Sequence, residues 1–223
     1  MTVGSEPDDK MGHAPLPTRR RAEHTMAMPA IRRHWTIDAV RELTREDTAW
    51  PRYELIGGEL FVTPAPRTMH QRAVAEPWRL LDEYVTRDAL GEALMSPADL
   101  ELRPGTITQP DVFVVPADTQ TAGAQLEWPD VKSLLLAVEV LSPASLHTDR
   151  VVKRDFYLDA GVEAYWIVDL DARVFEVWQP HENTPVVARD RLAWSPREQA
   201  PLIIDVTAFF TRIDEKARRF GQS

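Results

Sequence analysis

The chain has 223 residues, 43% of them hydrophobic and 27% charged, which is typical of a globular protein of one domain or at most two small domains. No apolar run approaches the roughly 18 residues of a membrane-spanning helix, and the first residues lack the apolar segment of a secretory signal, so neither feature is expected. A net charge of −9 argues against a protein that holds nucleic acid through a broad basic surface.

The sequence contains no cysteine, which excludes disulfides, thiolate zinc sites and cysteine nucleophiles, and a cytoplasmic location is expected. Residues 1–34 lack periodic hydrophobicity and are rich in proline and charge. We therefore predict a disordered N-terminal leader over residues 1–34 and a single domain over residues 35–223.

The first half of this domain is expected to hold two helices, a hairpin and two strands. Two glycines, Gly57 and Gly58, stand between β-prone runs and supply the positive φ angles of a tight hairpin turn. Thr36 is a suitable cap for the first helix, and apolar residues at three- and four-residue spacing predict a second helix that Gly91 ends. In chain order we predict a helix over 36–46, hairpin strands over 53–56 and 59–62, a helix over 68–88, and strands over 99–103 and 110–115.

The second half alternates strands and helices. The run Leu134–Leu141 is apolar apart from Glu139, which suits a strand buried on both faces. A helix that starts near Asp149 and ends at Gly161 joins this strand to the next one, so the two strands are expected to be parallel neighbours. The fold class is therefore α/β or α+β, with a mixed central sheet flanked by helices. The remaining predicted elements are strands over 165–168, 174–178 and 202–204 and a helix over 206–220.

Two carboxylates, Asp111 and Glu139, lie in or at the edge of runs apolar enough to be central strands. A buried carboxylate is costly unless it is paired or bound to a metal. If the two strands are neighbours, both side chains can converge at one end of the sheet, and the backbone carbonyl of Val140 would complete a set of hard oxygens of the kind that Mg²⁺ prefers. The alternative is structural: Asp111 caps a strand end, and Glu139 pairs with a buried Arg or Lys.

Lys153 follows on the predicted helix, with Asp149 four residues before it and Tyr157 four residues after it. All three side chains fall on one stripe of the helix. A lysine directed at water or at a phosphoryl oxygen would position a nucleophile and offset developing negative charge. The alternative is an ordinary ion pair with Asp149 on an exposed face.

A Pro-Asp pair, a spacer and then Glu-Val-Leu-Ser-Pro on an apolar strand resembles the PD-(D/E)XK nuclease superfamily. More narrowly, the chain resembles the Uma-type family of restriction-endonuclease-like proteins, over about residues 50–180 in the family's order and spacing. The residues that carry the resemblance are Tyr53 to Leu60, His70, Pro110-Asp111, Glu139 to Pro143, Asp149, Lys153, Tyr157, Gly161-Val162, Tyr165-Trp166 and Val168-Asp169.

The resemblance implies a restriction-endonuclease-like domain in which Asp111, Glu139 and the carbonyl of Val140 bind Mg²⁺ or Mn²⁺. The superfamily's usual lysine position is occupied by Leu141, so Lys153 on the following helix is expected to take its place.

Two further residues become candidates only through the resemblance. Glu59 is expected to add a carboxylate to the metal site, and His70 to act as a base. Their ordinary alternatives are an acid at the start of a strand and a histidine that caps a helix or faces solvent. Ala164 departs from the family, whose members often carry glutamate at this position.

The implied function is metal-dependent hydrolysis of phosphodiester bonds in DNA. Cutting both strands would need two sites, so a homodimer is expected. A membrane partner is not expected. Two alternatives stay open: an inactive binding or scaffold protein on the same fold, which the acidic balance favours, and a nuclease that acts on RNA. Motifs for phosphate-binding glycine loops, His-Glu-x-x-His metal sites and Gly-x-Ser-x-Gly nucleophiles are absent from the sequence.

Overall fold

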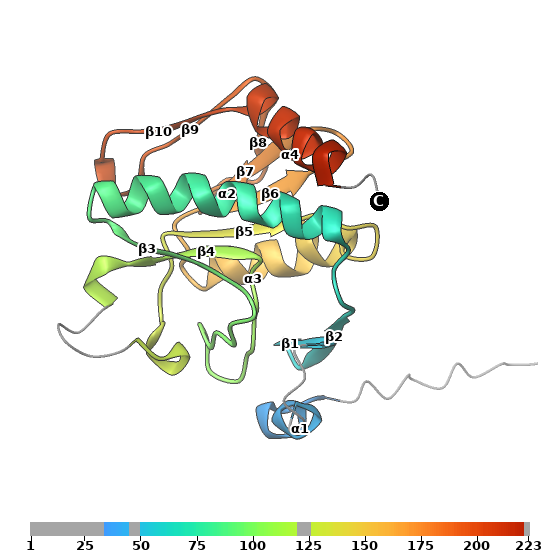
Figure 1. The fold of residues 1–223 in the computed structure, drawn as a ribbon. Coiled ribbons are helices and arrows are strands. Elements are labelled where there is room, and N and C mark those ends of the chain that lie inside the picture. Colours follow the sequence, from blue (N-terminus) through green and yellow to red (C-terminus); the bar gives the residue numbers. More distant parts are fainter. Residues whose placement is uncertain (1–33, 45–49, 120–125, 221–223) are drawn as a thin grey trace, which may run out of the picture. The chain divides into compact units, whose positions relative to one another are not determined.

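The computed structural model describes residues 34–44, 50–119 and 126–220 (Figure 1). Contacts divide the chain into Met1–Arg32 and Arg33–Ser223, and every described residue belongs to the second unit. The predicted leader therefore lies outside the described residues, apart from residue 34. The helices within these ranges are all too short or too polar to cross a membrane.

A mixed sheet forms the centre of this unit, with the strand order β3-β4-β5-β6-β7-β8. Its neighbouring strands are antiparallel except β5 and β6, which are parallel. The strands β1–β2 and β9–β10 form two separate antiparallel pairs. The strands are β1 Arg52–Ile56, β2 Glu59–Thr63, β3 Gly91–Met95, β4 Val112–Pro116, β5 Leu136–Val140, β6 Tyr165–Asp169, β7 Val174–Trp178, β8 Val186–Ala188, β9 Arg191–Trp194 and β10 Leu202–Asp205.

Helices pack on this mixed sheet, which confirms the predicted fold class. Besides the α-helices, the segment Thr148–Lys153 is π-helical and runs directly into α3. Three short 3₁₀ turns lie at Ala117–Thr119, Trp128–Asp130 and Pro196–Glu198. The α-helices are α1 Ile37–Leu43, α2 Thr68–Arg87, α3 Arg154–Asp159 and α4 Val206–Phe220.

The segment between β5 and β6 explains why these two strands are parallel. The π-helical turn and α3 carry the chain back along the sheet, and Gly161, at φ 83°, turns it into the next strand. Ala137 then lies opposite Tyr165 in the parallel register. The predicted helical crossover and its parallel neighbours are both confirmed.

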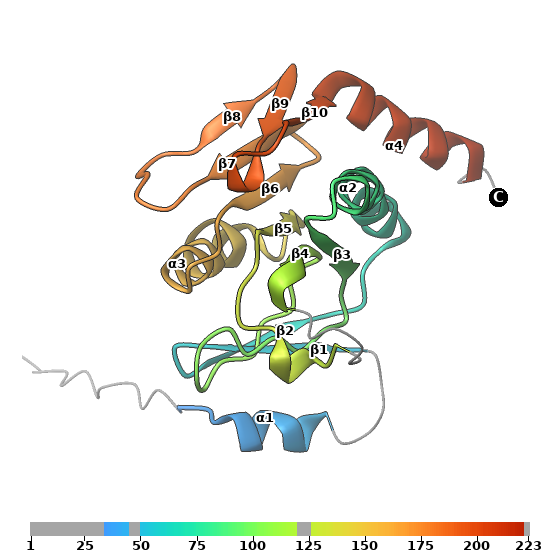
Figure 2. The same cartoon turned by 90° about the vertical axis from the view of Figure 1, so that its left-hand side faces the viewer.

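Apolar side chains pack on both faces of the sheet, so the strands β4, β5 and β6 are buried along their whole length. One face packs against α2 and α4, and the other packs against α3, as Figure 2 shows. Val112, Val138 and Trp166 belong to the first core, whereas Phe113 and Ala137 belong to the second. Successive side chains of these strands thus alternate between the two cores.

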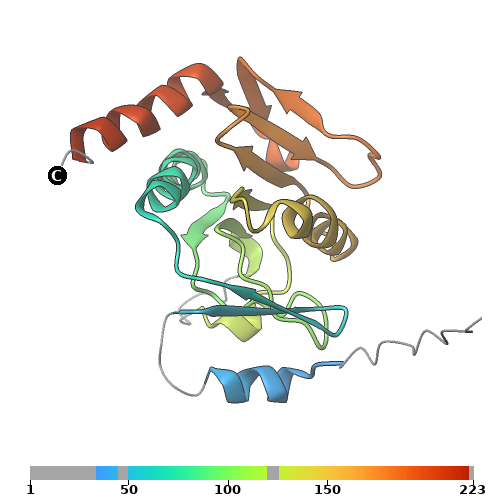
Figure 3. The same cartoon turned by 90° about the vertical axis from the view of Figure 1, so that its right-hand side faces the viewer.

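The β1–β2 hairpin and α1 form a smaller layer beside the sheet. Gly57 and Gly58 adopt φ angles of 59° and 77°, which confirms the predicted tight turn. Thr36 caps α1 by accepting a hydrogen bond from the amide of Ala39. Val40 of α1 and Leu55 of β1 pack together in a third apolar cluster, and Figure 3 shows α1 on the side of the hairpin away from the sheet.

Two sequence-based assignments between α2 and β4 are wrong. Gly91 does not end α2; it is the first residue of β3, where a Cβ atom would clash with the carbonyl oxygen of Val115. The chain leaves the helix at Asp88 and turns at Ala89, which adopts a φ of 50°. The predicted strand over 99–103 is loop, in which Leu100 makes an isolated bridge with Thr108. The strands β3, β8 and β9 were not predicted.

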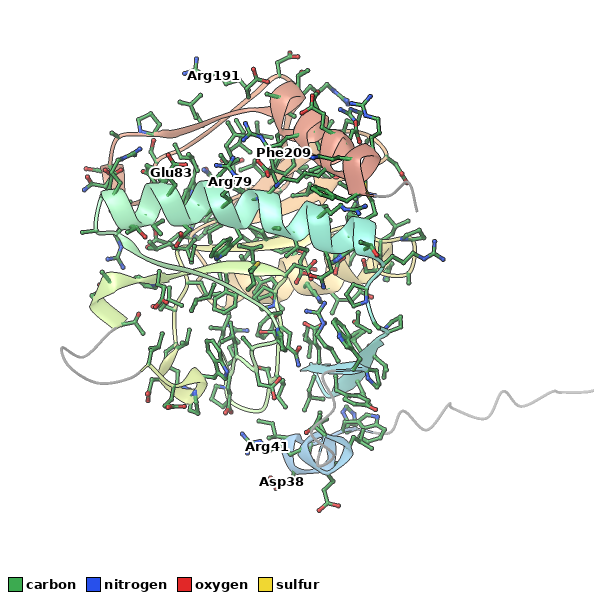
Figure 4. The ribbon with its side chains drawn as sticks, in the orientation of Figure 1. Asp38, Arg41, Arg79, Glu83, Arg191 and Phe209 are labelled. Carbon is green, nitrogen blue, oxygen red and sulfur yellow. The ribbon has the colours of Figure 1, made fainter. Side chains whose placement is uncertain are left out.

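A buried ion cluster fastens α2 to α4. Glu76, which is 0% exposed, accepts from Arg79 at 2.8 Å and pairs with Arg212 at 3.1 Å and Lys216 at 2.9 Å. Arg79 and Glu83 are one turn apart on α2, as Figure 4 shows. Burial raises the pKa of Glu76, but the bonds from Arg79 and Lys216 outweigh this, so its pKa lies below the ordinary value.

Replacing Glu76 by Gln is expected to lower the free energy of unfolding by about 1–3 kcal/mol at pH 7, because three cations lose their shared carboxylate. A carboxylate with a lowered pKa stabilises the fold above its unfolded pKa, and this contribution is lost as the pH falls through the folded value. Urea denaturation should therefore show the gap between Glu76→Gln and wild type closing in acid. Glu83→Gln on the exposed side of α2 is the control, and an equal loss there would contradict the assignment.

Candidate functional site

The register of β4 and β5 brings the two predicted carboxylates together. Val112 pairs with Val138, so continuing the antiparallel register by one residue places Asp111 opposite Glu139. Both residues are buried, at 5% and 3% exposure for the whole residue, and both line the same cleft of about 470 Å³. They point to the α3 face of the sheet, because Phe113 and Ala137, two residues from each, belong to the core on that face.

Asp111 is surrounded by donors. Its Oδ2 accepts the backbone N–H of Val140 at 3.0 Å and lies 3.3 Å from Nε2 of His70. Its Oδ1 accepts from the guanidinium of Arg52 at 3.1 Å. Burial raises the pKa of Asp111, but His70, Arg52 and the Val140 amide outweigh burial and lower it to about 2. Asp111 is therefore an ionised carboxylate at any physiological pH.

Lys153 lies among three buried carboxylates that also line the cleft. Its Nζ is 2.8 Å from Oε2 of Glu54, 3.1 Å from Oε1 of Glu139 and 3.5 Å from Oδ1 of Asp149. Tyr157, one turn further along the chain, directs its hydroxyl at Oε1 of Glu139 at 3.4 Å. The predicted stripe of Asp149, Lys153 and Tyr157 therefore faces inward and not toward solvent, and Asp149 and Lys153 line the cleft.

One cation among three carboxylates leaves an excess of buried negative charge. Burial, and then the neighbouring carboxylates Asp111, Asp149 and Glu54, raise the pKa of Glu139 well above its ordinary value, although Lys153 opposes this. Burial lowers the pKa of Lys153, but the attraction of Glu139, Glu54 and Asp149 outweighs it and raises the pKa well above the ordinary value. The ammonium of Lys153 is therefore firmly charged, while Glu139 holds a proton more readily than an exposed carboxylate.

Glu54 is a site residue that the sequence analysis missed. It lies on β1 between Tyr53 and Leu55, and its side chain is directed to the opposite side of the hairpin from Leu55, which packs toward α1. Its Oε1 accepts the backbone N–H of Gln109 at 2.8 Å, and its Oε2 meets Lys153. Glu54 thus connects the lysine to the segment that leads into Asp111.

Glu59 is not brought to the site. It begins β2 at the end of the hairpin, opposite Ile56, where it is exposed, and it is not among the residues that line the cleft. Arg52, two residues before Glu54 on β1, does line the cleft, and its guanidinium also lies over the ring of Trp50 at 4.7 Å. The first strand of the hairpin therefore supplies the cleft with Arg52 and Glu54.

His70 stands in the first turn of α2 and contacts Asp111 and Val140. Its Nε2 lies 3.0 Å from the carbonyl oxygen of Val140, which can only accept, so this nitrogen carries a proton. Burial lowers the pKa of His70, but the hydrogen bond with Asp111 outweighs burial and raises it. His70 therefore holds the Asp111 carboxylate and the Val140 carbonyl in place through one nitrogen.

The donor set fits a hard divalent cation. Oδ2 of Asp111 and the carbonyl oxygen of Val140 lie 3.3 Å and 3.0 Å from Nε2 of His70, so these two oxygens lie on the same side of the cleft. Glu139 is their neighbour across the register and lines the same cleft. Within the described ranges, no three His, Asp or Glu side chains are arranged to hold a metal ion. A site built here would therefore use two carboxylates and one carbonyl, with open positions of the kind that Mg²⁺ fills with water and substrate oxygens.

The walls of the cleft are apolar, in contrast to its charged floor. They come from the end of the hairpin, the start of α2 and the loop after β5. Val62 on this wall is 55% exposed although it is a large aliphatic residue. The side chains that form most of this surface are Phe61, Val62, Pro64, Pro66, Met69 and Pro143.

Comparisons with known proteins agree with this architecture. A solved structure from Anabaena variabilis, described as a putative nuclease belonging to DUF820, is similar with a TM-score of 0.63 and 20% sequence identity. The likeness covers 80% of this chain and 99% of that chain, and at this identity it concerns the fold alone. A search of the curated proteins found no match. The family model Uma2, described as "Putative restriction endonuclease", matches residues 38–204, which is most of the chain. The chain therefore belongs to the Uma2 family.

Proposed function

We propose that this protein is a metal-dependent endonuclease that hydrolyses phosphodiester bonds in DNA. The observation that carries the proposal is the pairing of Asp111 with Glu139 across β4 and β5, in one cleft with the buried ammonium of Lys153. Membership of the Uma2 family, described as "Putative restriction endonuclease", supports the same reaction class.

Asp111, Glu139 and the Val140 carbonyl would hold Mg²⁺ or Mn²⁺. A divalent cation supplies two things to such a reaction, because it lowers the pKa of water and offsets the negative charge of the phosphate. His70 fixes two of these oxygens, so we assign it a positioning role and not that of a base. Because Asp111 is ionised at physiological pH, the site needs no deprotonation of this residue before it can bind a cation.

Lys153 would act on the reacting atoms. Its ammonium is held in place by Glu54 and Asp149, and these contacts would remain if Glu139 bound a cation. A fixed positive charge in a site shielded from water stabilises the negative charge that develops on the phosphate and orients an attacking water. The lysine lies on the helix after the strand, which is where the resemblance places the catalytic lysine of this family.

The proposal is tested by incubating the purified protein with plasmid, single-stranded DNA and RNA in Mg²⁺, Mn²⁺ or EDTA. DNA cleavage is expected with metal and not with EDTA, and Asp111→Asn and Glu139→Gln are expected to abolish it. If the wild type cuts no substrate while binding DNA, the protein is a binding or scaffold protein. If the protein cleaves RNA but not DNA, its substrate is RNA. If both variants cleave as fast as the wild type, Asp111 and Glu139 are not catalytic residues.

Glu54→Gln is expected to lower kcat by about 10–100-fold with little change in KM, because Glu54 positions Lys153 and does not touch the substrate. The amide still accepts from Gln109, so the free energy of unfolding should change little. A steady-state assay at several pH values should also show an altered pH profile, which a purely structural role would not produce.

Glu59→Gln on the same hairpin tests whether Glu59, as the sequence analysis expected, or Glu54, as the structure indicates, belongs to the site. Its position at the exposed end of the hairpin predicts wild-type kcat. A loss of kcat in Glu59→Gln with an unaffected Glu54→Gln would reverse the assignment of these two glutamates.

A further inference from the structure

The carboxylates of the cleft are recessed, and this limits how a phosphate can reach them. The side chains of Asp111, Glu139 and Lys153 are 6%, 4% and 7% exposed. The phosphates of a duplex lie on a stiff cylinder with a persistence length of about 50 nm, so presenting one of them to a recessed floor requires deformation. A single strand has no such stiffness and can thread into a cleft.

The size of the cleft points to a small unit of nucleic acid. Its volume of about 470 Å³ falls within the range of roughly 300–1,000 Å³ of sites that enclose one small organic molecule. This volume suits a single nucleotide at the reacting position.

The cleft walls offer little to the phosphates of a duplex. Proteins that hold duplex DNA through its backbone use several Lys and Arg contacts. Of the cations that line the cleft, Arg52, Lys153 and His70 are already paired with carboxylates, which leaves Arg67 at the mouth. The acidic net charge of −9 makes a broad compensating surface unfavourable as well.

The same walls suit the face of a nucleobase. Phe61, Val62, Pro64 and Met69 present aromatic and aliphatic surface in the same cleft as Asp111 and Arg52. An unpaired base can be splayed out and packed against such side chains, whereas a stacked and paired base cannot. Packing of this kind tolerates every base, because each has a π-face.

We propose that the substrate enters this cleft as a single strand, with the base beside the scissile phosphate packed against the wall formed by Phe61, Val62, Pro64 and Met69. The inference rests on the proposed nuclease function and names the form of its substrate. One site then suffices for each cut, and cleavage does not require two copies of the chain.

The experiment compares one labelled DNA sequence in four forms, in Mn²⁺ and in Mg²⁺. The forms are a single strand, a full duplex, a duplex with a short unpaired gap, and a single strand with one abasic nucleotide. The single strand is expected to be cut at least about tenfold faster than the duplex. The gapped duplex is expected to be cut within its unpaired gap. Cleavage beside the abasic nucleotide is expected to fall by about tenfold or more, since packing of one base contributes on this scale.

Variants test the wall directly. Val62→Ser and Phe61→Ser are expected to raise KM for the single strand with little change in kcat. Phe61→Leu keeps the apolar wall and the fold, so its KM should be close to that of the wild type. Val186→Ser is the matched control, because Val186 is 70% exposed on β8 and does not line the cleft. Equal rates on duplex and single strand, or an abasic strand cut like the intact one, would overturn the inference and leave the nuclease function. If no form is cut, the nuclease function fails and the inference fails with it.

Discussion

Replacing Lys153 by Met is expected to abolish cleavage and to lower the free energy of unfolding of the metal-free protein by about 3–5 kcal/mol at pH 7, which is the usual cost of removing one partner of a buried pair. Glu54, Glu139 and Asp149 would remain buried without their shared cation. Urea denaturation in EDTA measures the loss, and the DNA assay measures cleavage.

The pH dependence of this loss has a definite sign. The pKa of Lys153 is raised, so its own contribution persists at neutral and acid pH and is lost only as the pH rises through the folded value. The pKa values of Glu139 and Asp149 are also raised, and carboxyls of this kind favour the fold when protonated. The deficit of Lys153→Met should therefore shrink between pH 8 and pH 5. Lys132→Met, at an exposed lysine that contacts a backbone carbonyl, is the control. Equal free energies of unfolding for Lys153→Met and Lys132→Met would contradict the conclusion that Lys153 stabilises a buried cluster of carboxylates.

Asp111→Asn and Glu139→Gln are both expected to abolish cleavage, but only Asp111→Asn is expected to lower the free energy of unfolding. Asp111 accepts from Arg52 and the Val140 amide, so Asn should cost about 2–3 kcal/mol by leaving buried donors unpaired. Glu139 is disfavoured as an anion by burial and by three other carboxylates, so a neutral Gln should leave the free energy of unfolding unchanged or raised. Lys153 keeps Glu54 and Asp149 as partners in this variant.

The pH profiles of these two variants differ as well. With a pKa lowered to about 2, Asp111 contributes stability above its unfolded pKa, and this is lost as the pH falls through the folded value. Glu139 favours the fold below its unfolded pKa and loses that contribution as the pH rises. Urea denaturation in EDTA from pH 3 to pH 8 should therefore show the cost of Asp111→Asn growing, and any gain from Glu139→Gln growing, toward pH 8. Similar losses in both variants would contradict this description of the site.

Patterns of short range predicted most of the fold. The turn at Gly57-Gly58, the cap at Thr36 and the crossover ending at Gly161 each depend on a few neighbouring residues, and each has the predicted form. The strands β3 and β9 mix polar with apolar positions, and β8 has only three residues, so neither helical nor strand periodicity identifies any of them. Gly91 was assigned to the wrong element because a glycine after a helix commonly ends it. Its actual role depends on Val115, which lies far along the chain.

A site residue could be predicted from the sequence where a charged side chain stands within an apolar strand. It could not be predicted where the charged side chain is buried only by contacts with distant parts of the chain. Glu139 stands in an apolar run, which marks it directly. Glu54 lies in a strand that alternates like any surface strand, and only the packing of the hairpin against the Gln109 segment buries it. The spacing of Lys153 from Asp149 is the same in an exposed ion pair and in a buried cluster, so the sequence left both alternatives open.

The contact between Glu54 and Lys153 also bears on synthesis of the chain. The ribosome releases Glu54 and Glu139 before it releases the lysine that pairs with both of them. Until the segment from Thr148 to Asp159 has packed beside β5, Glu54 and Glu139 lack that cation. A nascent chain therefore holds no finished cleft, and its cation-binding oxygens are brought together only when long-range contacts close the fold.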